Sequence, residues 1–154
     1  MSRLFILRHG EAENYAASGL DSDRNLTERG RAQVNRVLSR TAAQTVGITL
    51  IIASPYRRTQ QTAERVKVQF PNAEYQTWQE LIPESNPQLL CEKLQTLSQN
   101  KVLMVSHQPL VGTLVNGLCG CEYGRHPMDT ASFAGLEVDV FAAGMAELLW
   151  LEHA

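Results

Sequence analysis

The sequence predicts an α/β fold built on parallel strands. Short, continuously apolar runs alternate along the chain with segments of helical periodicity, the pattern of strands that are buried on both faces. The chain has 154 residues, of which 44% are hydrophobic and 19% are charged. This length and composition suit one compact domain over residues 1–154, and no repeat or linker divides it.

Three short apolar runs are predicted as the central strands, because none of them alternates with polar residues. They cover residues 4–7, 48–53 and 102–105. A short peripheral strand is predicted over residues 74–78. Two strand-like pieces end the chain, over residues 133–138 and 145–151, with Gly144 at the turn between them.

Four helices are predicted between and after these strands. Thr27 is a good N-cap for the first, which is expected to run to Gly47. Ser54 and Pro55 mark the start of the second helix, with Pro55 at or near its first position. The third opens at residues 86–87 (Asn-Pro), and the fourth starts within residues 106–109 (Ser-His-Gln-Pro).

The net charge of −2 argues against a nucleic-acid binder that works by bulk positive charge. No stretch approaches the roughly 20 apolar residues of a membrane span. The three cysteines are too few, and odd in number, for a disulfide framework. We therefore expect a cytoplasmic protein with reduced thiols, with no nucleic-acid or membrane partner.

Polar residues gather where predicted parallel strands end, the usual place for a ligand site in such folds. Arg8 and His9 follow the first strand, Arg57 follows the second, and His107 follows the third. Arg24 precedes the first helix and adds another guanidinium group. Guanidinium forks and helix N-termini both favour anions, so the expected occupant is a tetrahedral phosphoryl group.

A histidine among arginines favours its neutral form, because nearby positive charge lowers its pKa. If one ring nitrogen of His9 donates to a backbone carbonyl, the other is free to attack phosphorus and form a phosphoramidate. His107, if charged, would stabilise the transferring oxygens. No metal or other cofactor is expected, since arginines can neutralise the phosphoryl charge and no zinc-type ligand spacing occurs.

Four segments resemble the motifs of the histidine phosphatase (phosphoglycerate mutase-like) superfamily, in the same order and spacing. They are residues 7–11 (LRHGE), 25–30 (NLTERG), 54–63 (SPYRRTQQTA) and 106–112 (SHQPLVG). The short chain looks most like the SixA branch of protein phosphohistidine phosphatases. That resemblance implies a three-layer α/β/α fold with a mostly parallel sheet.

The resemblance also implies roles for individual residues. His9 becomes the phosphorylated nucleophile, and Arg8, Arg57 and His107 become phosphate ligands. Arg24 maps to a pocket arginine of the SixA-like branch, and we add Gln108 of the third motif as a substrate-binding residue. Arg58, next to Arg57, is expected to be a solvated surface charge.

The sequence leaves the leaving-group acid open. Larger members of the superfamily carry a carboxylate that protonates an alkoxide, and Glu80 is the nearest positional candidate here, with Glu84 behind it. A weak or missing acid suits phosphohistidine, because an imidazole leaves more readily than an ester oxygen. The expected partner is then a phosphohistidine-carrying signalling protein.

Two alternatives remain at this stage. A small-molecule phosphomonoesterase or mutase of the same superfamily would use an active Glu80. A noncatalytic phosphate-binding module would need only the cations, so a histidine at position 9 argues against it. The sequence assigns no role to residues 119–130, which begin Cys-Gly-Cys.

Overall fold

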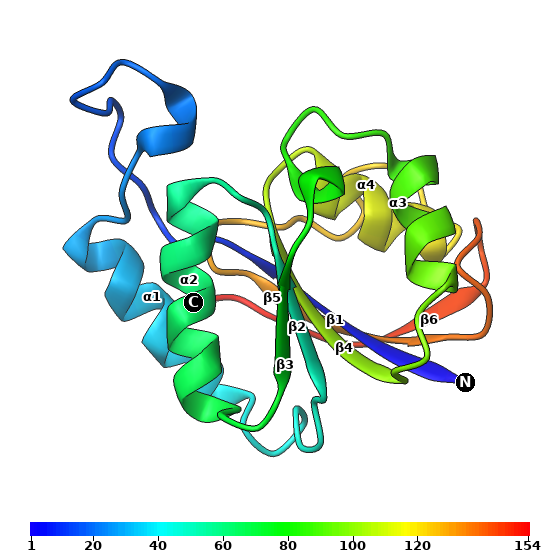
Figure 1. The fold of residues 1–154 in the computed structure, drawn as a ribbon. Helices are drawn as coiled ribbons and strands as arrows, with labels where there is room; N and C mark the ends of the chain where they lie inside the picture. Colours follow the sequence, from blue (N-terminus) through cyan, green and yellow to red (C-terminus); the bar gives the residue numbers. More distant parts are fainter.

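The computed structural model describes all 154 residues, and a six-stranded sheet lies at its centre (Figure 1). The strands are β1 (Ser2–Arg8), β2 (Leu50–Ala53), β3 (Glu74–Thr77), β4 (Lys101–Ser106), β5 (Phe133–Val138) and β6 (Ala146–Glu152). Their order across the sheet is β3-β2-β4-β1-β5-β6. The first four in this order pair in parallel, whereas β5 is antiparallel to both of its neighbours. The predicted α/β class and mostly parallel sheet are confirmed.

Four helices cover the sheet in two layers (Figure 1). They are α1 (Glu28–Arg40), α2 (Arg57–Gln69), α3 (Pro87–Gln95) and α4 (Leu110–Leu118). The pair α1 and α2 lies on one face of the sheet, and the pair α3 and α4 lies on the other. None of these helices is long and apolar enough to cross a bilayer.

The two layers create two separate apolar cores, because successive side chains of a strand point to opposite faces. On β1, Leu4 and Ile6 belong to the core under α3 and α4. Phe5 and Leu7 belong to the core under α1 and α2. All four are at most 1% exposed, which explains why β1 reads as an uninterrupted apolar run.

Two predicted helix boundaries are wrong. The first helix ends at Arg40 rather than near Gly47, because Thr41 leaves the helical conformation while its hydroxyl donates to the Val37 carbonyl. The second helix begins at Arg57, two residues after Pro55, with Tyr56 as its N-cap. This later start decides which side chains of α2 face the site.

Gly10 and Gly30 let the first turn of α1 approach the end of β1 closely. A Cβ atom on Gly30 would lie 2.1 Å from the Glu11 carbonyl oxygen, and one on Gly10 would lie 2.5 Å from the Gly30 carbonyl oxygen. Only glycine fits at such distances between backbones. The glycines of two separate sequence motifs therefore meet beside His9.

Candidate active site

The topology brings the two site histidines together at the carboxyl edge of the sheet. Neighbouring strands β1 and β4 are parallel, with Arg8 paired to Ser106, so the residues after them meet. The backbone amide of His9 donates to the Ser106 carbonyl at 3.1 Å. The ring centroids of His9 and His107 are 5.2 Å apart, in an edge-to-face arrangement.

The hydrogen bonds of His9 leave its Nε2 atom as the basic nitrogen of the ring. Nδ1 lies 2.7 Å from the Gly10 carbonyl oxygen, to which it must donate. Arg58 Nε donates to Nε2 at 3.3 Å, which requires a lone pair there. His9 is only 6% exposed, so this neutral, oriented ring is held inside the protein. The geometry suits a nucleophile that acts through Nε2.

Two buried polar atoms beside His9 have no hydrogen-bond partner: Arg8 Nε and His107 Nδ1. Such orphans are rare in folded proteins and call for an explanation. His107 Nε2 is already hydrogen-bonded to the Ser54 hydroxyl at 2.8 Å. If that hydroxyl donates, His107 Nδ1 carries a proton and is a free donor like Arg8 Nε. Two unused donors next to a nucleophile suit an oxyanion.

Burial and positive charge keep both rings neutral. Burial is the largest cause that lowers the pKa of His9, to about 3, and the guanidinium groups of Arg58, Arg8 and Arg24 add to it. Burial also lowers the pKa of His107, to about 2, with further contributions from His9 and Arg58. A bound dianion would act in the opposite direction and favour protonation of His107.

The structure places Arg58, and not Arg57, against the nucleophile. Arg58 is 4% exposed and contacts His9, so its predicted place at the solvated surface is wrong. The Arg57 side chain is 51% exposed and reaches Asp23, at 3.7 Å. Because each helical residue is rotated by about 100° from the last, only one of two consecutive arginines can face the site.

A sequence signal for Arg58 was available in the helical period. Arg58 lies four residues before Thr62 and eight before Val66, which places all three on one face of α2. Thr62 and Val66 are fully buried. Arg57 lies seven residues before Glu64, on the exposed face.

Arg24 lies close to the site and is held by other groups. Its Nη1 donates to Asp21 Oδ1 at 2.8 Å, and its Nε donates to the Glu13 carbonyl. Asp21 Oδ2 accepts from Arg58 Nη2 at 3.1 Å, so one carboxylate bridges two arginines. The hydrogen bond from Arg24 is the largest cause that lowers the pKa of Asp21. Arg8 has no carboxylate partner within salt-bridge distance, and its Nη1 donates to the Met128 carbonyl at 3.0 Å.

Glu80 is ion-paired with Lys93 and makes no hydrogen bond to the histidines or arginines of this cluster. It lies in the short turn Gln79–Leu81, and Lys93 Nζ donates to its Oε2 at 3.0 Å. A hydrogen bond from its own backbone amide lowers the pKa of Glu80 most, and Lys93 adds to the effect. An ionised carboxylate has no proton to give, so this arrangement does not favour the predicted acid role.

Gln108 and residues 119–130 form one wall of the site. Gln108 Nε2 donates to the Met128 carbonyl at 3.1 Å, and its Oε1 accepts from the Gly112 amide at 2.8 Å. Gln108 thus uses both ends of its side chain to hold backbone, which differs from the predicted direct contact with substrate. Arg8 also lines a neighbouring cavity of about 200 Å³ between this segment and α4. No group of three His, Cys, Asp or Glu side chains is placed to hold a metal ion.

Comparison with known protein sequences identifies close relatives. A family model described as "Histidine phosphatase superfamily (branch 1)" matches residues 4–83. The chain is 37% identical over 135 residues to phosphohistidine phosphatase SixA of Escherichia coli (strain K12), covering 84% of this chain and 81% of that protein. It is 32% identical to a SixA homolog of Haemophilus influenzae, covering 96% of this chain and 87% of the relative.

Solved structures show the same arrangement. A protein histidine phosphatase SixA complexed with tungstate superposes with a TM-score of 0.84 at 30% identity, covering 98% of this chain and 96% of the other. A phosphoserine phosphatase mutant from Entamoeba histolytica superposes with a TM-score of 0.71 at 17% identity, a likeness that concerns the fold alone. Other proteins of known structure therefore share the three-layer fold of this chain.

Proposed function

Since the chain belongs to the histidine phosphatase superfamily, in its SixA branch, we propose that it hydrolyses phosphohistidine through a covalent intermediate on His9. The observation that carries this proposal is the state of His9, a buried neutral ring whose Nδ1 is bound to the Gly10 carbonyl and whose Nε2 keeps its lone pair. The unpaired Arg8 Nε and His107 Nδ1 supply donors for a phosphoryl oxygen. The solved SixA relative that holds tungstate, a tetrahedral oxyanion, supports this choice of ligand.

In the first step, the lone pair of His9 Nε2 forms a bond to phosphorus while the bond from phosphorus to the substrate nitrogen breaks. The electron pair of that bond returns to the substrate ring. Arg8, Arg58 and His107 neutralise the charge on the phosphoryl oxygens, which is most of what this reaction asks of a protein. The hydrogen bond from Arg58 Nε to His9 Nε2 breaks as the phosphoryl group approaches, because the Nε2 lone pair must then bond to phosphorus.

In the second step, water attacks the phosphorus of the intermediate. The nitrogen–phosphorus bond breaks, its electron pair returns to His9 Nε2, and the water proton leaves with the phosphate or to solvent. The nucleophile is thereby restored with the same tautomer, because the Gly10 carbonyl still accepts from Nδ1. No residue other than His9 changes its covalent bonds.

The position of Glu80 favours phosphohistidine over a phosphate ester as substrate. An alkoxide leaves poorly without a proton donor, and the hydrogen bonds from its own backbone amide and from Lys93 keep Glu80 ionised. A phosphohistidine ring that carries a proton on its other nitrogen leaves as neutral imidazole and needs no acid. We propose a phosphohistidine-carrying signalling protein as the partner. The three cysteines are free thiols, which accords with our proposal that the protein works in the cytoplasm.

The test is rapid mixing with a ³²P-labelled phosphohistidine peptide, followed by a quench and peptide mapping. We expect label on His9 that is labile in acid and stable in base. His9→Ala should lower the turnover by at least about a thousandfold. The same variant should still bind tungstate, because Arg8, Arg58 and His107 remain.

Three results would contradict the proposal. Base-labile label, or label on another residue, would refute the phosphohistidine intermediate. Faster hydrolysis of small phosphate esters than of phosphohistidine would favour the phosphomonoesterase alternative. A wild-type protein that binds tungstate but turns over neither substrate would be the noncatalytic module.

A further inference from the structure

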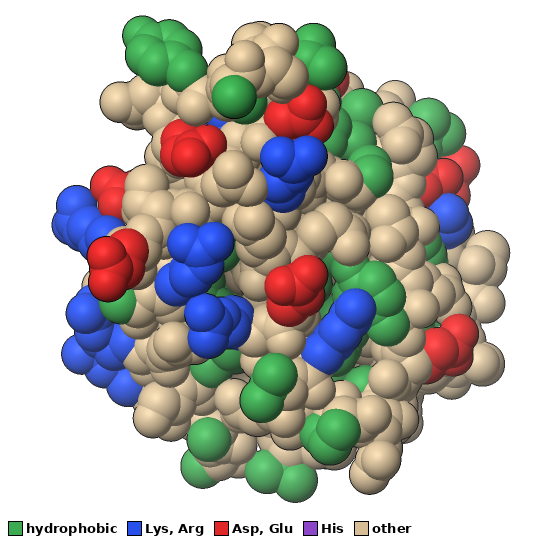
Figure 2. Space-filling model, turned by 60° about the vertical axis from the view of Figure 1, so that its left-hand side comes forward, with side chains coloured by type: hydrophobic (Ala, Val, Ile, Leu, Met, Phe, Trp, Pro, Cys, Tyr) green, Lys and Arg blue, Asp and Glu red, His purple; other side chains and the backbone are tan.

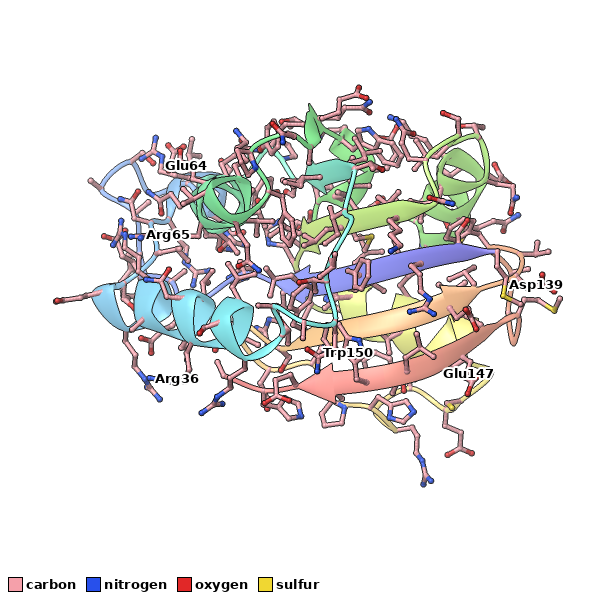
Figure 3. The ribbon with its side chains drawn as sticks, turned by 90° about the horizontal axis from the view of Figure 1, so that it is seen from below. Arg36, Glu64, Arg65, Asp139, Glu147 and Trp150 are labelled. Carbon is pink, nitrogen blue, oxygen red and sulfur yellow. The ribbon has the colours of Figure 1, made fainter.

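The charges of this chain are unevenly distributed between its two helical layers. Helices α1 and α2 carry eight Lys or Arg against two Asp or Glu. The whole chain carries 14 against 16, so the rest of the molecule has an excess of acid. On the face in Figure 2, Lys and Arg side chains gather toward the left of the view. Figure 3 places Arg36 and Arg65 on this helical layer, with Asp139 and Glu147 at the opposite end of the molecule.

Two exposed arginines of α1 and α2 have no internal partner. Arg36 and Arg65 are exposed and make no ion pair or side-chain hydrogen bond with the rest of the chain. Arg29 is 76% exposed and only loosely paired with Glu11, at 3.5 Å. Arg57 is paired with Asp23 at 3.7 Å, but its side chain is 51% exposed. Arg36 and Arg65 are therefore free to bind a second molecule, and Arg29 and Arg57 remain accessible to it. We call this surface, made by Arg29, Arg36, Arg57 and Arg65, the basic face.

The basic face is continuous with the phosphoryl pocket. Arg57 and Arg58 are the first two residues of α2, so the helix starts in the pocket and its exposed side leads away from it. Helix α1 has 13 residues and extends for about 20 Å beside α2. At the pocket end, the segment before α1 exposes Tyr15 by 87% and Leu20 by 59%. Arginine and tyrosine are enriched in protein interfaces, and a typical interface spans such a distance.

We propose that the basic face docks an acidic protein surface that surrounds the phosphohistidine to be hydrolysed. The proposal rests on the proposed function, and it names the kind of partner. A substrate must carry phosphohistidine for the pocket and negative charge for the face beside it. A protein can carry both, whereas a nucleic acid has the charge without the phosphohistidine. The acidic remainder of the molecule repels the partner elsewhere and orients its approach.

The test uses two synthetic peptides of about 20 residues, which span about 30 Å as helices. Each contains one histidine phosphorylated with phosphoramidate, flanked by glutamates in one peptide and by glutamines in the other. The test variant is Arg36→Glu/Arg65→Glu, far from the nucleophile. The control is Arg3→Glu/Lys101→Glu, which changes the net charge equally at the opposite end of β1 and β4. Free phosphohistidine reports the activity of the pocket alone.

We expect wild type and the control to prefer the glutamate peptide by about tenfold in kcat/KM at low ionic strength, and to lose this preference in high salt. The Arg36→Glu/Arg65→Glu variant should lose the preference and keep its activity on free phosphohistidine. Equal kcat/KM for both peptides in wild type, or an unchanged preference in that variant, would overturn the proposal. So would a single-stranded RNA of similar length that binds wild type more tightly than the glutamate peptide and loses affinity in the variant. If the wild type hydrolysed neither of the peptides nor free phosphohistidine, the proposed phosphohistidine phosphatase activity would be refuted. The docking proposal, which rests on that activity, would be refuted with it.

Discussion

At the scale of the residue, the decisive feature is the environment of one imidazole. His9 owes its orientation to the Gly10 carbonyl and its neutral state to burial and to three nearby guanidinium groups. Arg58 contacts Nε2 directly and is itself held by Asp21 through two hydrogen bonds, one to the backbone carbonyl at 2.7 Å and one to the carboxylate at 3.1 Å. The nucleophile is thus kept neutral and aligned before any substrate arrives, which reduces the reorganisation that the reaction requires.

The two consecutive arginines of α2 provide a matched pair for mutation. Arg58→Ala should lower kcat/KM for free phosphohistidine by about 100-fold or more, because it removes a buried positive charge beside the phosphoryl group that is transferred. Arg57→Ala, which removes an exposed side chain paired with Asp23, should change kcat/KM for free phosphohistidine by no more than about twofold. Steady-state kinetics on that substrate measures both. If Arg57→Ala were the more damaging change, our assignment of the pocket arginine would be wrong.

At the scale of the element, contact between backbones fixes where α1 begins relative to β1. The Thr27 hydroxyl accepts from the Gly30 amide and caps the helix, while the Thr27 amide donates to the Glu11 carbonyl at 2.9 Å. Glu11, two residues after His9, is thereby tied to the N-cap of α1. The Thr62 hydroxyl of α2 also accepts from the Gly10 amide, at 3.3 Å. Two helices therefore support the loop that presents the nucleophile.

Glycine substitutions test this close approach. Gly30→Ala should lower the free energy of unfolding by roughly 2 kcal/mol or more, because its Cβ would overlap the Glu11 backbone and force α1 away from β1. Gly117→Ala in α4 is the control, since a Cβ there meets nothing within 4 Å. It should be neutral or should stabilise by up to about 1 kcal/mol through helix propensity. Urea denaturation of both variants measures these effects, and similar values for the two would contradict the packing argument.

At the scale of the whole molecule, the site has a cost in stability that depends on pH. His9 and His107 have pKa values of about 3 and about 2 in the folded protein, whereas the unfolded chain has ordinary histidines with a pKa near 6.5. Above pH ~6.5 both rings are neutral in both states. Below pH ~6.5 the two histidines bind protons in the unfolded chain but not in the folded protein. The free energy of unfolding therefore falls as the pH falls.

We expect the free energy of unfolding to drop between pH 7.5 and pH 5.5 by about 1.4 kcal/mol for each of the two rings. His107→Gln should remove about half of this dependence, because it removes one of the two buried rings. Urea denaturation at both pH values provides the measurement. Phosphate should reduce the loss, since a bound dianion favours protonated rings. A slope unaffected by His107→Gln would show that other groups control the pH dependence.

Local patterns in the sequence predict much of this fold and part of the site. The apolar runs locate the strands, because burial on both faces requires uninterrupted hydrophobic residues. The caps Thr27 and Asn86 locate two helix starts, because a side-chain oxygen is needed there. The position of His9 and His107 after parallel strands predicts that they meet. These features depend on residues that are near one another in the chain.

The sequence by itself determined the α/β class, the strand and motif positions and the pair of histidines at the sheet edge. Only the tertiary structure decided that Arg58 rather than Arg57 faces His9, and that Lys93 holds Glu80 as a carboxylate. It also decided that Gln108 holds backbone and that α1 and α2, with their exposed arginines, lie on the same side of the sheet. The physical reason is that the direction of a side chain follows from the exact start of its helix, and an ion pair follows from distances across the fold. Neither is encoded in a local pattern of residue types.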